Sequence, residues 1–187
     1  MSGDAIHMNY YSRLGPIDPQ VPLDDRKMVP ALGYLVQWER LLKKAKDGKL
    51  TTAEVQLMIY GFDQAELYKY EQAREHSIKL LKEWLAKYKF KNWSKTATQG
   101  KVVTDKMRTQ RAEQIARELN KTDKWHSHGY GISMDVLRND LNLLIDDFDS
   151  DPDVGGRIKE YYSLLADYMG KRDDHGVVHT DRYLPFL

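Results

Sequence analysis

The sequence contains no cysteine among its 187 residues. A disulfide framework, a thiolate zinc site and a cysteine nucleophile are therefore excluded. Excess charge is also missing, because 29 lysines and arginines stand against 28 aspartates and glutamates, for a net charge of +1. Such a balance gives no overall field that would attract nucleic acid or an anionic membrane. We therefore expect no nucleic-acid partner, no need for an oxidising compartment, and a cytoplasmic protein.

Long apolar runs are absent as well. No stretch approaches the roughly 20 residues that a membrane-spanning helix needs, and the first residues lack the basic and then apolar pattern of a signal peptide. No internal repeat and no low-complexity tract interrupts the chain. With 41% hydrophobic and 30% charged residues, the chain suits an ordinary globular domain with a real core. We expect no membrane contact in this segment.

The first 20 residues organise the chain. Residues 6–11 alternate apolar and polar side chains and include tyrosines, which is typical of a short strand. Residues 14–20 (LGPIDPQ) predict a stiff turn, because both prolines lack a backbone donor and disfavour helix before them. One short strand is not stable alone. Either earlier strands of its sheet are missing or supplied by a partner, or it pairs with a later segment of this chain.

Most of the remaining chain has the periodicity of amphipathic helices. Capping and stop signals predict helices near 30–46, 52–58, 62–88, 104–120, 133–141 and 152–170, with loops at 21–28, 89–103 and 122–131. Residues 142–147 fit either a strand or a continuing helix. The tail 171–187 is charged and then apolar, and an apolar terminus usually docks on its own core or on a neighbour.

Residues 14–20 (LGPIDPQ) resemble the strand and turn that follow the nucleophile helix in Clp-protease-like and signal-peptide-peptidase-like serine peptidases, in particular the serine dehydrogenase proteinase family. Residues 125–129 (WHSHG) and 132–137 (ISMDVL) are a second match. The resemblance spans nearly the whole chain but only the C-terminal part of the family. It implies an α/β crotonase fold, of which this chain supplies a predominantly helical portion with one or two short strands. Residues 1–148 would belong to the peptidase domain and 149–187 to a C-terminal helical extension and tail.

The resemblance also implies a function. In the family the nucleophilic serine lies shortly upstream of this strand, at the start of a helix, in a region that this sequence does not contain. We therefore expect Met1 to be an internal methionine of a longer protein. The full-length protein would hydrolyse peptide or protein substrates through an acyl-enzyme, as a homo-oligomer and without a cofactor. The chain is expected to be inactive alone.

Asp18 and Lys27 are the candidate catalytic residues, because of their places in the resemblance. Asp18 stands where the Clp branch has its general-base histidine, but a carboxylate with an ordinary pKa is a poor base for a serine hydroxyl at neutral pH. The alternative for Asp18 is a turn residue that bonds its own backbone. Lys27 stands before a helix, where the signal-peptide-peptidase branch has its lysine base. That role needs burial to lower the lysine pKa, whereas the charged neighbours at 24–26 indicate an ordinary surface lysine.

Three further features carry little chemistry. Ser2 precedes a glycine, as a nucleophilic serine often does, but lacks the glycine-rich turn that would supply oxyanion donors. Two histidine pairs, His126 with His128 and His175 with His179, have metal-like spacing. Each pair falls short of the three protein ligands that a zinc site needs. We expect no metal site, and a structural role for the loop that contains the first pair.

A second class of function fits the same sequence. Twelve tyrosines are present, and several of them cluster on predicted helices, namely Tyr68, Tyr70, Tyr161, Tyr162 and Tyr168. Amphipathic tyrosines suit interfaces as well as half-buried helix faces. The alternative function is therefore a non-catalytic helical interaction module, which could regulate a full-length peptidase.

Overall fold

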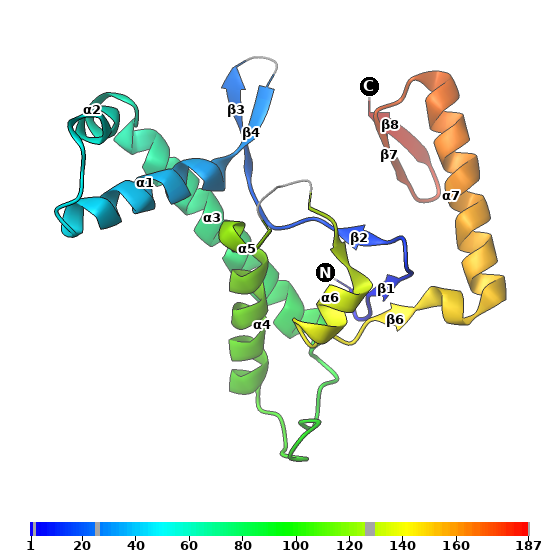
Figure 1. Cartoon of the computed structure of the whole chain (residues 1–187). Helices are drawn as coiled ribbons and strands as arrows, with labels where there is room; N and C mark the ends of the chain where they lie inside the picture. Colours follow the sequence, from blue (N-terminus) through cyan, green and yellow to red (C-terminus); the bar gives the residue numbers. More distant parts are fainter. Residues whose placement is uncertain (2, 25–26, 126–129, 187) are drawn as a thin grey trace.

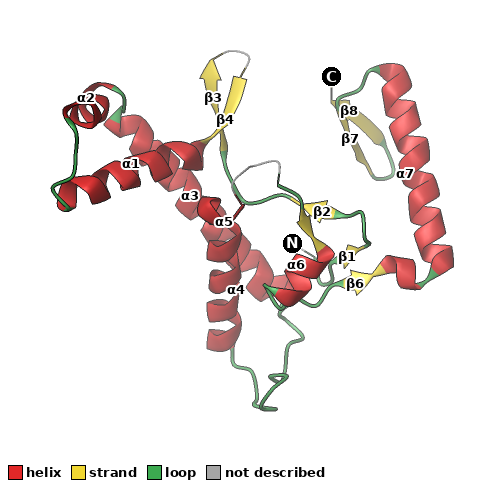
Figure 2. Ribbon diagram, in the orientation of Figure 1, coloured by secondary structure: helices red, strands yellow, loops and turns green. Residues whose placement is uncertain are grey.

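Helix dominates the structure, as predicted. The computed structural model describes residues 1, 3–24, 27–125 and 130–186, and more than half of the chain is helical (Figures 1 and 2). The helices are α1 (Ala31–Lys46), α2 (Thr52–Tyr60), α3 (Gln64–Trp84), α4 (Asp105–Leu119), α5 (Thr122–Trp125), α6 (Met134–Asn139) and α7 (Pro152–Arg172). A π-helical turn, η1 (Leu85–Lys89), extends α3, and a 3₁₀ turn, η2 (Phe148–Ser150), precedes α7.

The described residues form four sheets of two strands each, so the expectation of one or two strands is wrong. β1 (His7–Met8) pairs parallel with β6 (Asp146–Asp147), and β2 (Arg13–Leu14) pairs antiparallel with β5 (Ile132–Ser133). β3 (Gln20–Asp24) with β4 (Lys27–Pro30), and β7 (Gly176–His179) with β8 (Tyr183–Phe186), are antiparallel hairpins. Both hairpins lie in segments for which the sequence predicted no strand. A hairpin satisfies its backbone groups by local pairing across a short connection, which a search for apolar alternation does not detect.

Capping residues place the helix starts where the sequence predicts them. The Thr51 hydroxyl accepts a hydrogen bond from the Glu54 amide, and the Glu54 carboxylate accepts one from the Thr51 amide, which completes the predicted capping box. The other side-chain caps are Asp63 for α3, Thr104 for α4, Ser133 for α6 and Asp151 for α7. Gly48 follows α1 with a left-handed φ of 65°, so the predicted stop is also confirmed.

The N-terminal strand is shorter than predicted and pairs within this chain. Only His7–Met8 is strand, because Asn9 starts a turn in which its Oδ1 accepts hydrogen bonds from the Ser12 amide at 2.9 Å and the Ser12 hydroxyl at 2.8 Å. The partner strand β6 lies in 142–147, the segment that the sequence left undecided. The pairing covers two residues on each side.

Two apolar clusters stabilise the fold. The larger one lies where α3, η1, α4 and α6 meet β1 and β5, and its most buried large side chains are Leu85, Ile115, Leu119, Ile132 and Leu137. Full burial of one such side chain contributes about 1.5–3 kcal/mol. The smaller cluster joins α1 and the start of α3 to β3 and includes Leu32, Leu35, Leu67 and Tyr70.

The proline-flanked turn at 16–19 connects these clusters. Ile17 packs against the larger cluster, and Val21 belongs to the smaller one. The Ile17 amide donates to the Leu119 carbonyl at 3.1 Å, and the Asn120 side-chain amide donates to the Ile17 carbonyl at 2.8 Å. Asn120 is 9% exposed, so this turn is fastened to the end of α4 by bonds largely shielded from water.

Residues 151–186 form a unit that we call the C-terminal arm. It consists of α7 and the β7–β8 hairpin, and it stands beside the body of the molecule, joined to it through β6 and η2 (Figure 1). The arm begins in close contact with η2, because a Cβ on Gly155 would lie 2.7 Å from a carboxylate oxygen of Asp149. The hairpin is attached to α7 by the buried Asp174 carboxylate, which accepts hydrogen bonds from Arg172 at 3.2 Å and the Tyr183 hydroxyl at 2.7 Å.

Replacing Asn120 with alanine tests the attachment of the turn. The change Asn120→Ala leaves the Ile17 carbonyl without its donor, and a group left unpaired in this way typically costs about 1–3 kcal/mol of unfolding free energy. Urea denaturation followed by circular dichroism measures the loss. The matched control is Asn139→Ala, an exposed site at the end of α6, which should change stability by no more than about 0.5 kcal/mol. Equal effects of both changes would contradict this account of the turn.

The hydroxyl of Tyr183 gives the hairpin attachment a pH dependence. Removal from water and the hydrogen bond to Asp174 raise the pKa of Tyr183 to about 12. Because this pKa lies above the value of about 10 for tyrosine in an unfolded chain, the contribution to stability is complete below pH ~10 and is lost between pH ~10 and ~12. Tyrosinate absorbance of the wild-type chain minus that of Tyr183→Phe should isolate this late titration. A difference curve with its midpoint near pH ~10, the value for an unperturbed tyrosine, would disprove the raised pKa.

Candidate functional site

Asp18 lies at the N-terminus of α1. Its Oδ1 accepts a hydrogen bond from the Leu32 amide at 3.3 Å, and the carbonyl of the next residue, Pro19, accepts one from the Ala31 amide at 2.8 Å. The helix needs these acceptors because its own N-cap, Pro30, provides no side-chain bond. A negative charge at this position is also favoured by the helix dipole. The carboxylate therefore caps a helix whose Leu32 amide lies 14 residues further along the chain.

Two adjoining hollows lie beside the capped turn. The smaller one holds about 10 Å³ and is lined by residues 16–18, Leu32, Leu119, Asn120, Lys121 and Trp125. The larger one holds about 290 Å³ and is lined by Leu32, Leu35, Val36, Glu39, Arg74, Asn120 and Lys121. The two hollows share Leu32, Asn120 and Lys121. The larger hollow, formed by α1, α3 and the end of α4, is the candidate binding site.

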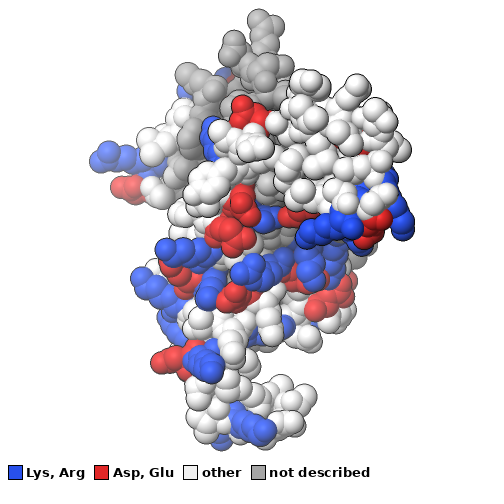
Figure 3. All heavy atoms as spheres, turned by 90° about the vertical axis from the view of Figure 1, so that its left-hand side faces the viewer, with Lys and Arg blue, Asp and Glu red and all other residues white. Residues whose placement is uncertain are grey.

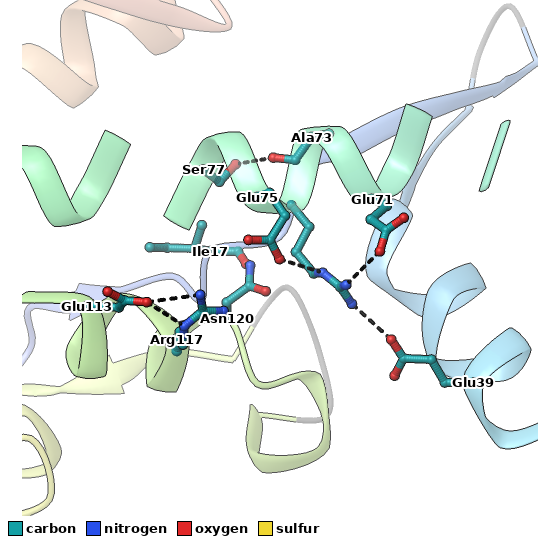
Figure 4. Close-up of polar contacts among 10 residues, drawn as sticks. Ile17, Glu39, Glu71, Ala73, Glu75, Ser77, Glu113, Arg117 and Asn120 are labelled. Carbon is teal, nitrogen blue, oxygen red and sulfur yellow. Dashed lines mark hydrogen bonds and ion pairs between the residues drawn. The ribbon is translucent and has the colours of Figure 1, made fainter. Parts of the chain in front are cut away.

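The larger hollow has one apolar wall and one charged wall. The apolar wall is the face of α1 that carries Leu32 and Leu35. On the charged wall, the Arg74 guanidinium lies 3.0 Å from Glu39, 3.6 Å from Glu71 and 3.6 Å from Glu75. Figure 4 shows these three carboxylates converging from α1 and α3. The side chains that line the hollow include one acid, Glu39, and two bases, Arg74 and Lys121, so the charged wall is mixed in sign.

Ion pairs join the helices that surround the hollow. Lys82 on α3 lies 2.7 Å from Glu113 on α4, and Glu113 also accepts hydrogen bonds from Arg117 (Figure 4). Hydrogen bonds from Lys82 and Arg117 lower the pKa of Glu113, and one from Lys121, with a smaller one from Lys124, lowers the pKa of Glu118. These downward shifts suit stable ion pairs and do not suit a general acid at neutral pH.

The backbones of Lys27 and Asp18 lie at opposite ends of the β3–β4 hairpin. Lys27 pairs with Asp24 at the far end of the β3–β4 hairpin, whereas Gln20 pairs with Pro30 at its base. Asp18 precedes Gln20, so it lies beyond the base, and Lys27 lies near the tip. About three residues of strand, or roughly 10 Å, separate Lys27 from Pro30 at the base of the hairpin. The two candidate catalytic residues therefore mark opposite ends of one hairpin.

The remaining sequence candidates form no site in the described residues. Ser2, His126 and His128 lie outside those residues. His179 is hydrogen-bonded through Nδ1 to the Tyr161 hydroxyl, and His175 is exposed at the start of the hairpin. Residues 1, 3–24, 27–125 and 130–186 contain no group of three histidines, aspartates or glutamates that could hold a metal ion. The same ranges contain no helix long and apolar enough to cross a membrane.

Sequence reasoning did not find the residues of the hollow. Glu39, Arg74 and Asn120 are far apart in the sequence, and nothing in their neighbourhoods distinguishes them from other helix residues. Asn120 was predicted only as the end of a helix, which is correct but says nothing about its bond to Ile17. Comparison with protein-family models, with curated proteins and with solved structures finds no significant match to the chain.

Paired substitutions at Asp18 separate the contribution of the cap to stability from that of the negative charge. Asp18→Asn keeps an oxygen that can accept the Leu32 amide, so stability should stay within about 0.5 kcal/mol of the wild type, whereas Asp18→Ala should cost about 1 kcal/mol. Urea denaturation of both variants gives the comparison. If Asp18→Asn were as destabilising as Asp18→Ala, the carboxylate would contribute through its charge rather than through the cap.

Proposed function

We propose that the chain is the C-terminal part of a Clp-like serine peptidase of the serine dehydrogenase proteinase type. The observation that supports this proposal is the β1–β6 pair, a parallel sheet of two residues per strand. Parallel strands occur almost only inside larger sheets that are covered by helices, and two short strands have little stability of their own. Met8 of β1 is nevertheless 2% exposed and packed in the larger cluster. In a crotonase fold, further parallel strands from the upstream segment would extend this pair into a larger sheet.

The proposed reaction needs a serine from an upstream segment. Lys27 in its neutral form would take the proton of that hydroxyl while the serine oxygen attacks the peptide carbonyl. The protonated Lys27 would then give this proton to the departing amine as the C–N bond breaks, which leaves the acyl-enzyme. Water, deprotonated by the neutral Lys27, would attack the ester carbonyl, and the carboxylic acid product would leave as the serine hydroxyl is regenerated. Asp18 has a positioning role in this proposal, because its cap fixes the base of the hairpin that carries Lys27. The hollow beside the hairpin base would receive a side chain of the peptide or protein substrate. The assembled enzyme is a homo-oligomer, and the chain alone is inactive.

Fluorophosphonate labelling tests the proposed function. The chain alone should not be labelled, and a mixture with a polypeptide that contains the family's glycine-rich turn and serine helix should be labelled on that serine. Lys27→Ala in the mixture should lower the labelling rate by roughly 100-fold or more, the usual contribution of a general base. The matched control is Lys49→Ala, an exposed lysine after α1, which should leave the rate unchanged. Labelling of the chain alone, or a mixture that never labels, would falsify the proposal.

A second candidate function is a non-catalytic interaction module. The observation in its favour is the exposure of α2. None of its described side chains is buried, and its apolar residues Val55, Leu57, Ile59 and Tyr60 are 40–84% exposed. A helix that is apolar on all sides is normally covered. Stable binding between the chain and the upstream polypeptide without any labelling would favour this function over the peptidase.

A further inference from the structure

The charge of the chain is unevenly distributed along the sequence. Residues 85–112 contain eight lysines and arginines and a single acid, Asp105, whereas the rest of the chain has 21 basic and 27 acidic residues. The eight cations are Lys87, Lys89, Lys91, Lys95, Lys101, Lys106, Arg108 and Arg111. The net charge of +1 therefore conceals one strongly basic segment, and the lack of an overall field does not exclude local binding of a polyanion.

Residues 93–106 of this segment form a short projection that we call the basic finger. Lys95 pairs with Val102 in an antiparallel bridge. Beside this bridge, the Thr96 amide donates to the Lys101 carbonyl at 2.9 Å. The finger is thus a narrow two-stranded loop, and it projects beyond the start of α4 in Figure 1. Its internal hydrogen bonds hold the lysines on a folded scaffold.

The base of the finger is fastened to the larger apolar cluster. The Arg108 guanidinium donates to the Trp93 carbonyl at 3.1 and 3.3 Å, and the Trp93 ring lies 5.7 Å from the ring of Phe90. Phe90 is 9% exposed, and Trp93 packs against the same cluster. Neither ring therefore offers the open face that stacking with the bases of a single strand requires.

Three lysines of the finger, Lys95, Lys101 and Lys106, are available to bind an anion. All three are exposed, and no ion pair in the described part of the chain occupies them. Adjacent residues of a strand point to opposite faces. Because Lys95 is paired with Val102, the neighbouring Lys101 lies on the other face of the finger. Figure 3 shows basic side chains and no acidic ones on the lowest lobe of the molecule, which this loop forms.

Nearby carboxylates reduce the positive charge of the segment but do not cancel it. Asp105 pairs with Arg108 at 2.9 Å, and two acids from the body, Asp4 and Asp146, interact with lysines at the start of the segment. With all three acids counted, residues 85–112 and these neighbours still have a net charge of +5. The three acids act on cations at the base of the finger and leave its own lysines unpaired.

A lipid surface fits the finger less well than a nucleic acid does. Peripheral membrane binding combines basic side chains with apolar ones that enter the bilayer. Among residues 93–106, all of which the structure describes, Val102 is the only large apolar side chain that is well exposed, at 74%. The other exposed residues include serine, threonine and glutamine. A phosphodiester backbone accepts hydrogen bonds from such side chains as well as from lysine.

We infer that the basic finger is a binding site for the phosphate backbone of double-stranded DNA, independent of base sequence. The major groove of B-form DNA, about 12 Å wide, admits a two-stranded ribbon. Lysines on both faces of the finger then reach the phosphates of the strands on either side. The major groove of A-form RNA is deep and narrow, which favours DNA. The inference goes beyond the proposed peptidase function and does not depend on it.

Fluorescence anisotropy of a labelled DNA duplex of mixed sequence, titrated with the full chain, tests this inference. We expect a dissociation constant of about 10⁻⁶–10⁻⁴ M and a slope of log affinity against log salt of about −2.7, the value for three phosphate contacts. Raising the salt from about 50 to about 200 mM should therefore weaken binding by roughly 40-fold. Lys95→Ala with Lys101→Ala removes two contacts and should lower the affinity at least about 10-fold and change the slope to about −0.9.

The matched control is Lys43→Ala with Lys46→Ala in the last turns of α1, the other lysine-rich part of the surface. Both lysines are exposed, and their loss changes the total charge by the same amount. This variant should change the affinity by less than about 2-fold, because its lysines lie outside the finger. Circular dichroism checks that both variants are folded. Equal losses of affinity in the two variants would overturn the inference.

Competing ligands decide which kind of polyanion binds. Polyglutamate, vesicles of phosphatidylserine and phosphatidylcholine, single-stranded DNA and an RNA duplex should each bind more weakly than the DNA duplex. A tighter complex with any of them, no binding of the DNA duplex, or binding that does not change with salt would overturn the inference.

Cross-linking tests whether the finger itself contacts the duplex, and the absence of cysteine makes an introduced thiol unique. A benzophenone attached to Thr98→Cys, in the turn of the finger, should cross-link to the duplex on illumination. The same label on Tyr60→Cys of α2, where Tyr60 is 84% exposed, should not. Cross-linking from α2 but not from the finger would contradict the inference. None of these measurements depends on peptidase activity, so the inference and the proposed function fail separately.

Discussion

The structure depends on the attachment of one short, proline-flanked turn to two helix ends. The Ile17 amide and carbonyl bond to the end of α4 through Leu119 and Asn120, and Asp18 with Pro19 satisfies the start of α1. Free helix ends are costly when they are shielded from water, because four donors or four acceptors lack partners in the helix. One turn therefore supplies partners to both helices and fixes the angle at which the two apolar clusters meet.

This attachment also shapes the candidate binding site. With α1 and α4 held at the turn, their side chains leave a hollow of about 290 Å³ that α3 closes with Arg74 and its carboxylates. Lys27 lies at the opposite end of the hairpin that starts from the same turn. In the proposed peptidase, an upstream segment would bring the nucleophile and its oxyanion donors to the hairpin.

The composition of the two apolar clusters also explains why some helices are exposed. The apolar clusters use the inner faces of α1, α3, α4 and α6, while α2 and α7 contribute almost nothing to them. A chain with this composition can cover the outer helices only by contact with other polypeptides. In the proposed peptidase, the nucleophile-bearing segment would supply part of this cover.

The sequence by itself determined the helices, because caps such as Thr51, Asp63 and Asp151 and stops such as Gly48 act over three or four residues. It also determined that residues 14–20 form a rigid turn, because proline restricts its own backbone and that of the residue before it. Only the tertiary structure decided what that turn bonds to, which segment pairs with β1, and that Glu39, Arg74 and Asn120 line one hollow. Those contacts join residues 12 to 139 positions apart, and their energy depends on packing that no local pattern encodes.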